Sequence, residues 1–123
     1  MTIERDSRAP TGKMAPRALE EHILAFRGSP RKDVLVGPAV GEDAAVIALP
    51  GGPFLVVASD PVVGAAKGAG RLLVHVNAND VASKGGEPAY LLVTMILPRN
   101  MTERDAAAFM EEMHEACLEL NIA

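Results

Sequence analysis

The chain begins with a polar stretch and then takes up the spacing of a helix. Residues 1–15 are polar, contain a proline and a glycine, and predict a flexible N-terminal arm. Apolar side chains then recur at Leu19, Ile23 and Phe26, which would lie on one face of a helix. We expect this helix to begin at Pro16, a favourable first-turn residue, and to be stopped by the Gly and Pro that follow.

Short apolar runs predict four strands. The first three occupy residues 34–36, 44–49 and 54–59, and the fourth, a buried strand, lies within residues 88–98. The second and third are separated by Pro-Gly-Gly-Pro at residues 50–53, which predicts a hairpin. Their nearly continuous apolar character predicts strands that are covered on both faces, by helices on one and by another subunit on the other.

Two longer segments predict helices in the second half of the chain. Residues 69–84 are followed by a Gly-Gly pair that would stop a helix. One face of that helix would carry Leu73, Asn77, Asp80 and Lys84. A final helix should follow Thr102, with Asp105 close to completing a capping box. The order of these elements is an α+β pattern with a hairpin at its centre.

Composition narrows the class of protein. The 123 residues suit one domain, and with 49% apolar but only 3% aromatic residues the core must consist of Ala, Val, Leu, Ile and Met. The net charge of −4 argues against a nucleic-acid partner, which would require a basic surface. The single cysteine, Cys117, excludes an internal disulfide and is typical of a reducing, cytoplasmic location.

The two ends of the chain also bear on its context. The N-terminus is charged and has no apolar stretch of the kind found in secretory signals. No apolar run reaches the roughly 20 residues that a membrane helix requires, so we expect no membrane partner. The last helix runs to the end without a Gly or Pro stop, which predicts a fragment in which residues 16–123 form one domain of a longer protein.

Three aspartates bracket the apolar runs. In an antiparallel hairpin the start of the first strand lies beside the end of the second, so Asp43 and Asp60 should meet opposite the turn. Asp80, flanked by Asn77 and Asn79, stands on the following helix. Carboxylates that converge without a counter-charge repel one another, and Mg²⁺ bound with nucleotide phosphates would relieve that repulsion. The pattern predicts phosphoryl transfer from ATP, with backbone amides of the glycine-rich residues 64–70 near the phosphates.

Structural interpretations of the same residues stand beside this one. Asp60 precedes a proline and could be an ordinary turn residue, and Asp43 could mark a solvated strand entry. Asp80 is harder to explain structurally, because aspartate is unfavourable inside a helix. The chain contains no Walker-type phosphate loop and no dinucleotide fingerprint.

Three sequence motifs occur along the chain in the order GPAVGEDAAVI, ASDPVVGA and VNANDVASKGGEP. They resemble the N-terminal domain of the aminoimidazole ribonucleotide (AIR) synthetase superfamily, also called PurM-like. That superfamily includes thiamine-monophosphate kinase, selenophosphate synthetase and the hydrogenase maturation protein HypE. Its three motifs match residues 41–45, 59–60 and 79–85, and the chain looks most like the HypE and AIR-synthase-related branch.

The resemblance implies an α+β fold in which a mixed four-stranded sheet carries helices on one face and pairs with the sheet of a second subunit in a homodimer. It implies ATP near the subunit interface and Mg²⁺ held by Asp43, Asp60 and Asp80. The arm around Lys13 would correspond to a segment that folds over the nucleotide, and Asn77 or Asn79 would orient phosphate or water. The full set of expected nucleotide-binding residues is Lys13, Gly41, Asp43, Asp60, Asn77, Asn79 and Asp80.

The implied function is that of an ATP-binding domain in an enzyme that phosphorylates an amide or carboxamide oxygen with Mg²⁺-ATP. In the HypE branch this serves hydrogenase maturation, with a maturation partner protein. A kinase similar to thiamine-monophosphate kinase and a non-catalytic dimerisation or partner-binding module are the alternatives. The family's second domain begins with a glycine-rich motif that is not found in this sequence, so we expect the fragment alone to be inactive.

Overall fold

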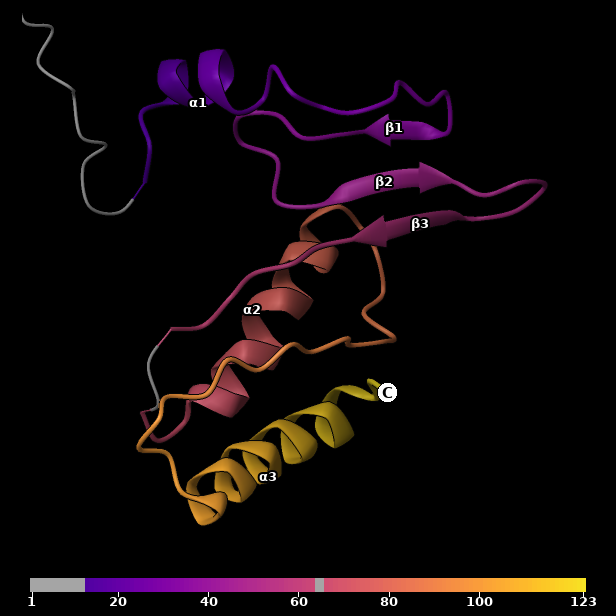
Figure 1. The fold of residues 1–123 in the computed structure, drawn as a ribbon. Helices are drawn as coiled ribbons and strands as arrows, with labels where there is room; N and C mark the ends of the chain where they lie inside the picture. Colours follow the sequence, from indigo (N-terminus) through magenta and orange to yellow (C-terminus); the bar gives the residue numbers. More distant parts are fainter. Residues whose placement is uncertain (1–12, 64–65) are drawn as a thin grey trace, which may run out of the picture.

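The structure is a computed structural model of the chain, and it describes residues 13–63 and 66–123. The predicted arm over residues 1–15 falls almost entirely outside the described residues. The elements in order are α1 Pro16–His22, β1 Val34–Val36, β2 Ala45–Ala48, β3 Phe54–Val57, α2 Ala69–Ser83 and α3 Glu103–Leu120. Figure 1 shows the strands and α1 at one end of the molecule, α2 in the middle and α3 at the other end. The α+β class is confirmed.

The three strands form one antiparallel sheet in the order β1-β2-β3. Ala45 lies opposite Val57 and Ala48 opposite Phe54, which confirms the predicted hairpin. At its turn, the amide of Gly52 donates to the carbonyl oxygen of Leu49 at 3.3 Å. The hairpin therefore forms where a Gly-Gly pair supplies backbone freedom between two β-branched runs.

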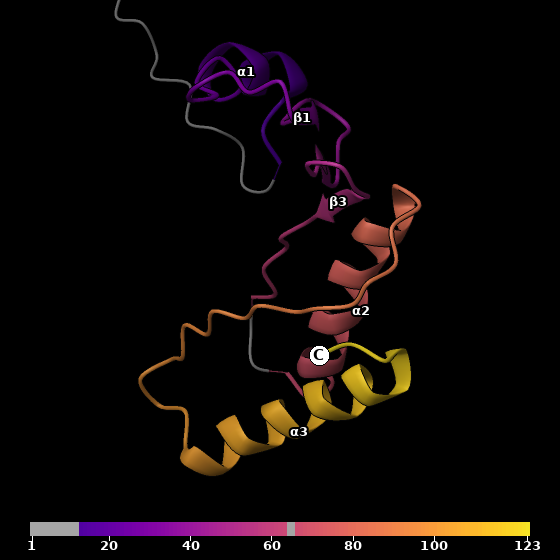
Figure 2. The same cartoon turned by 90° about the vertical axis from the view of Figure 1, so that its right-hand side faces the viewer.

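The sheet has three strands in the described part of the chain, and the expected fourth strand does not join it. Residues 88–98 are extended, and they run past α2 in both views (Figures 1 and 2). Their side chains alternate: Leu91 and Val93 pack on the core, whereas Leu92 is 98% exposed and Ile96 is 93% exposed. The apolar spacing of a strand is present, but no neighbouring strand in the described residues supplies a ladder, so the prediction of a buried strand was wrong.

One short pairing does occur on this extended segment. The amide of Ala123 donates to the carbonyl oxygen of Ala89 at 3.0 Å, and the amide of Leu91 donates to the carbonyl oxygen of Ala123 at 2.8 Å. In parallel strands, one residue forms hydrogen bonds to the two residues that flank the residue opposite it. Ala123 therefore lies beside residues 89–91 in parallel alignment.

The core lies between α2 and α3. Val74, Met113 and Ala116 are buried there, and Phe109 and Cys117 pack against them. The helices approach closely at Gly70, where an added Cβ would lie 2.4 Å from the carbonyl oxygen of Phe109. No helix in the described residues is long and apolar enough to cross a membrane.

The start of α3 confirms the predicted cap. The amide of Asp105 donates to the hydroxyl oxygen of Thr102 at 3.1 Å, and the amide of Thr102 donates to the Asp105 carboxylate at 3.1 Å. The hydroxyl of Thr102 also contacts that carboxylate, and these hydrogen bonds lower the pKa of Asp105. Two donors at the helix start are thus satisfied by the pair that the sequence pattern identified.

The first helix is shorter than predicted, and the two apolar residues expected on its last turns are exposed. It ends at His22, and of the predicted stripe Ile23 is 49% exposed and Phe26 is 82% exposed. Among the residues that the structure describes, no helix packs extensively across the sheet either, because the main contacts join α2 to α3 and strand to strand. The spacing of apolar residues predicted burial correctly only where the described chain supplies a second surface to pack against.

Candidate metal and nucleotide site

The hairpin brings two of the predicted aspartates to the same end. Asp43 lies two residues before Ala45, and Asp60 lies three residues after Val57, the residue opposite Ala45. Gly41 precedes them in a left-handed conformation with φ of 82°, which a side chain would strain. The open end of the hairpin thus carries two carboxylates, as the strand order predicted.

Asp80 comes to the same place from α2. It stands one turn before the C-terminal end of the helix, which is the end nearest β3 (Figure 1). Partial burial raises the pKa of Asp80, and the negative charges of Asp60 and Asp43 raise it further. The carboxyl group of Asp60 is also close enough to accept a hydrogen bond from protonated Asp80. Asp43 and Asp60 therefore act on Asp80, although the three residues are far apart in the sequence.

Asn77 holds the main chain at Asp60. Its side-chain oxygen accepts from the amide of Asp60 at 2.8 Å, and its side-chain nitrogen donates to the carbonyl oxygen of Asp60 at 3.0 Å. The same nitrogen donates to the carbonyl oxygen of Leu73 at 2.9 Å, which anchors the amide to its own helix. In this structure Asn77 is occupied by protein contacts, whereas Asn79 is exposed.

Lys84 makes a second link between α2 and the hairpin. Its ammonium group forms an ion pair with the carboxylate of Glu42, and the two side chains are only 24% and 31% exposed. Glu42 directly precedes Asp43, so the ion pair fixes the strand entry beside α2. The sequence analysis predicted Lys84 on the same helix face as Asp80 but gave it no role. That shared face was the one sequence feature that could have pointed to a contact near Asp43.

The donor set of the three aspartates matches only part of what a metal ion requires. Within the described residues, no ion pair involves Asp43, Asp60 or Asp80, so their charges have no protein counter-ion there. Nor do any three His, Cys, Asp or Glu side chains of that part of the chain lie close enough together to form a metal site on their own. Mg²⁺ usually takes only one or two carboxylates together with waters and substrate phosphates. The arrangement fits Mg²⁺ with a nucleotide better than a site built only from protein ligands.

The predicted phosphate contact with the glycine-rich loop is not what the structure shows for its described glycines. The amide of Gly68 donates to the Glu112 carboxylate at 2.8 Å, and the amide of Gly70 donates to it at 3.0 Å. A carboxylate at the N-terminal end of α2 already takes the position that a phosphate would take. In this structure these two amides are engaged by Glu112, and no feature of the local sequence pointed to that contact.

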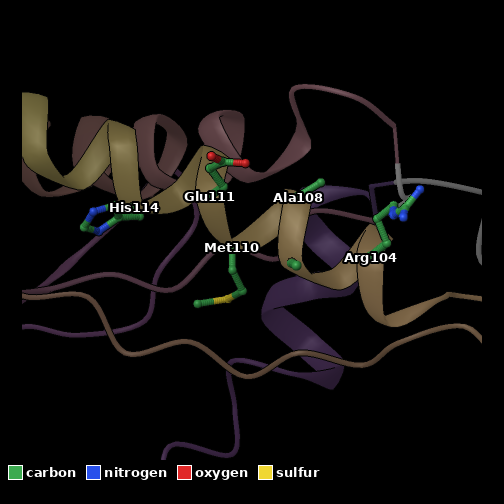
Figure 3. A pocket seen from close by; sticks show the side chains of 6 residues that line it. Arg104, Ala108, Met110, Glu111 and His114 are labelled. Carbon is green, nitrogen blue, oxygen red and sulfur yellow. The ribbon is translucent and has the colours of Figure 1, made fainter.

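Lys13 is exposed, and within the described residues no hydrogen bond or ion pair joins it to the three aspartates. Two hollows elsewhere are open and shallow. The larger, about 600 Å³, lies on α3 among Arg104, Ala107, Ala108, Met110, Glu111 and His114 (Figure 3). The other, about 410 Å³, lies near the start of α3 and includes Lys67 and Glu112. Neither contains an aspartate of the candidate site.

The larger part of the chain matches a known protein family. Residues 41–123 match the model of the AIR synthase related protein, N-terminal domain, which is more than half of the chain. The chain belongs to this family. The part that matches the AIR synthase related domain contains all three aspartates, both sides of the hairpin, and helices α2 and α3. No significant match was found among curated proteins or among solved structures.

Proposed function

We propose that this domain binds Mg²⁺-ATP for an enzyme that phosphorylates an amide or carboxamide oxygen. Membership of the AIR synthase related family supports the proposal. The observation that carries it is the position of Asp80, whose carboxyl group is close to those of Asp60 and Asp43. An apolar chain gains nothing from gathering three acids unless a cation joins them.

The chemistry follows from charge. ATP carries negative phosphates and would be repelled by the aspartates, and Mg²⁺ between the two would convert that repulsion into binding. When bound, the metal would neutralise charge that develops on the transferred phosphoryl group. The chain would hold Asp60 through Asn77 and the strand entry at Asp43 through Glu42 and Lys84.

The branch within the superfamily is also a proposal. The successive stretches GKMAPRALEEHILAFRG and VLVGPAVGEDAAVI resemble the HypE and AIR-synthase-related branch, which supports a role in hydrogenase maturation with a partner protein. A small-molecule kinase similar to thiamine-monophosphate kinase would use the same metal and nucleotide. The two would differ in the acceptor and not in the contacts made by the aspartates.

Calorimetric titration tests the nucleotide site. We expect heat on adding ATP with Mg²⁺ to the wild-type chain and much less heat without Mg²⁺. In Asp43→Asn the affinity should fall by at least about tenfold, because one charged oxygen donor is lost. Asp33→Asn is the matched control. Asp33 directly precedes β1, whereas Asp43 follows it, and Asp33 forms an ion pair with Arg31. Absence of heat in the wild type, or equal heat in Asp43→Asn, would contradict the proposal.

We further propose a homodimer through the sheet and the extended residues 88–98. The described chain buries few apolar side chains but leaves apolar residues exposed along this segment and on β3. They include Tyr90, Leu92, Ile96, Phe54 and Leu55, which are 87%, 98%, 93%, 65% and 44% exposed. Exposed strand edges with apolar side chains are surfaces that a second copy can cover. A non-catalytic dimerisation module would use the same surface.

Light scattering after gel filtration tests the dimer. We expect the wild type to elute as a dimer and Leu92→Glu to weaken the dimer by roughly thirtyfold, the effect of losing about 2 kcal/mol at an interface. Leu118→Glu is the control, because Leu118 is also exposed, at 67%, but lies on α3. A wild-type monomer at high concentration, or equal weakening by both variants, would count against this interface.

A further inference from the structure

We infer that Asn77 and Lys84 are positioning residues, and that α2 uses them to hold the two aspartate-bearing loops on either side of Asp80. This inference rests on the proposed metal and nucleotide site. It goes further by assigning a role to two residues that would not themselves bind the metal. Asn77 lies on α2 three positions before Asp80, and Lys84 lies four positions after Asp80, as the residue that caps the C-terminal end of α2.

The first connection fixes Asp60. Asn77 forms one hydrogen bond to the amide of Asp60 and one to its carbonyl oxygen, at 2.8 and 3.0 Å. Two hydrogen bonds to the main chain of one residue restrain both its position and its orientation. The bond from Asn77 to Leu73 leaves the amide little freedom to turn. Asp60 follows β3 in a segment without secondary structure, so this contact supplies order that the segment lacks.

The second connection fixes the loop that carries Asp43. Lys84 forms an ion pair with Glu42, and both side chains are more than two-thirds covered. The effect of Lys84 on the aspartates therefore acts through the position of the loop.

The arrangement makes physical sense for a metal site. A helix is more rigid than a loop, and ligands are held best by side chains that are themselves restrained. Asp80 has a fixed place on α2, while Asp43 and Asp60 would otherwise lose conformational freedom when a metal binds. By tying both loops to the helix beforehand, Asn77 and Lys84 would lower that cost.

The test compares isosteric, conservative and control variants by calorimetric titration with Mg²⁺-ATP. Asn77→Leu and Lys84→Met should each weaken binding by roughly tenfold to a hundredfold, as loss of a group that orients a metal ligand does. Lys84→Arg should bind like the wild type. The double swap Glu42→Lys with Lys84→Glu should recover most of the affinity, because it restores the link between loop and helix. Arg71→Met is the control; it removes the α2 ion pair to Glu119 and should leave binding unchanged.

Amide hydrogen exchange without ligand gives an independent readout. Asn77→Leu should speed exchange at Asp60 alone, and Lys84→Met should speed exchange at residues 41–43 alone. If the wild type binds Mg²⁺-ATP and both variants bind equally well, the inference is overturned while the proposed function stands. Unchanged exchange at both loops would overturn the inference in the same way. If the wild type binds no Mg²⁺-ATP, the titration shows this before any variant is used, and the proposed function falls together with the inference.

Discussion

Asp80→Asn is expected to stabilise the ligand-free chain and at the same time to abolish its binding of Mg²⁺-ATP. The asparagine has nearly the same shape as aspartate but carries no charge. It would therefore remove the repulsion from Asp60 and Asp43, and its side-chain nitrogen could donate to Asp60 as protonated Asp80 does. Binding should weaken by at least about a hundredfold, because the metal would lose a charged ligand.

The stabilising effect of Asp80→Asn should depend on pH. The folded chain raises the pKa of Asp80 above its ordinary value of 3.8, so the folded state binds this proton more tightly than the unfolded state. The contribution of Asp80 to the free energy of unfolding of the wild type is therefore lowest at a pH above the pKa of Asp80 in the folded chain. That contribution recovers as the pH falls through this pKa towards 3.8. The advantage of the variant should be greatest at neutral pH and should shrink as the solution becomes acidic.

Urea unfolding at several pH values, combined with calorimetry, measures both effects. A variant that is less stable than the wild type at neutral pH would show that Asp80 is a structural residue held by favourable contacts. Retained Mg²⁺-ATP affinity would show that the cation lies elsewhere. Glu111→Gln, which removes the charge of an exposed acid on α3, more than 30 positions from each of the three aspartates, serves as a charge-matched control.

Gly70→Ala should destabilise the chain strongly. Alanine is ordinarily the better helix residue by up to about 1 kcal/mol. Here its methyl group would lie 2.4 Å from the carbonyl oxygen of Phe109 and 3.0 Å from Cβ of Glu112. The two helices would have to separate around Val74 and Met113, at a net cost of about 2 kcal/mol or more.

Gly52→Ala is the matched control for this substitution. Gly52 is exposed in the hairpin turn, and the nearest atom to an added Cβ is the carbonyl oxygen of Pro50 at 3.7 Å. Its unfolding midpoint in urea should stay close to that of the wild type. A Gly70→Ala chain as stable as the control would show that α2 and α3 do not approach as closely as described.

The elements that the sequence predicted best are those that local chemistry determines. The hairpin follows from a Gly-Gly turn between β-branched runs, and the cap of α3 follows from Thr102 and Asp105 alone. The approach of Asp43 to Asp60 could be predicted for the same reason, because the pairing of the hairpin determines which residues meet at its open end. Asp80 could be added because aspartate inside a helix needs an explanation.

The remaining features depend on tertiary neighbours that one sequence does not reveal. Residues 88–98 have the composition of a strand, but a ladder requires a partner along the edge. Similarly, Ile23 and Phe26 were expected on the apolar face of α1, but they lie beyond its end and are exposed in the described chain. Glu112 contacts Gly68 and Gly70, which are 44 and 42 positions away in the sequence, and Lys84 contacts Glu42, which is 42 positions away. Charged residues at that separation give no periodic signal.

The parallel alignment of Ala123 beside residues 89–91 has a practical consequence for anyone producing this chain. A purification handle fused after Ala123 would start in hydrogen-bonding contact with that segment and would be laid along its free edge. Such a fusion would mimic or obstruct a neighbouring strand in every assay of assembly. Handles fused to the N-terminus leave Ala123 unchanged and avoid that interference.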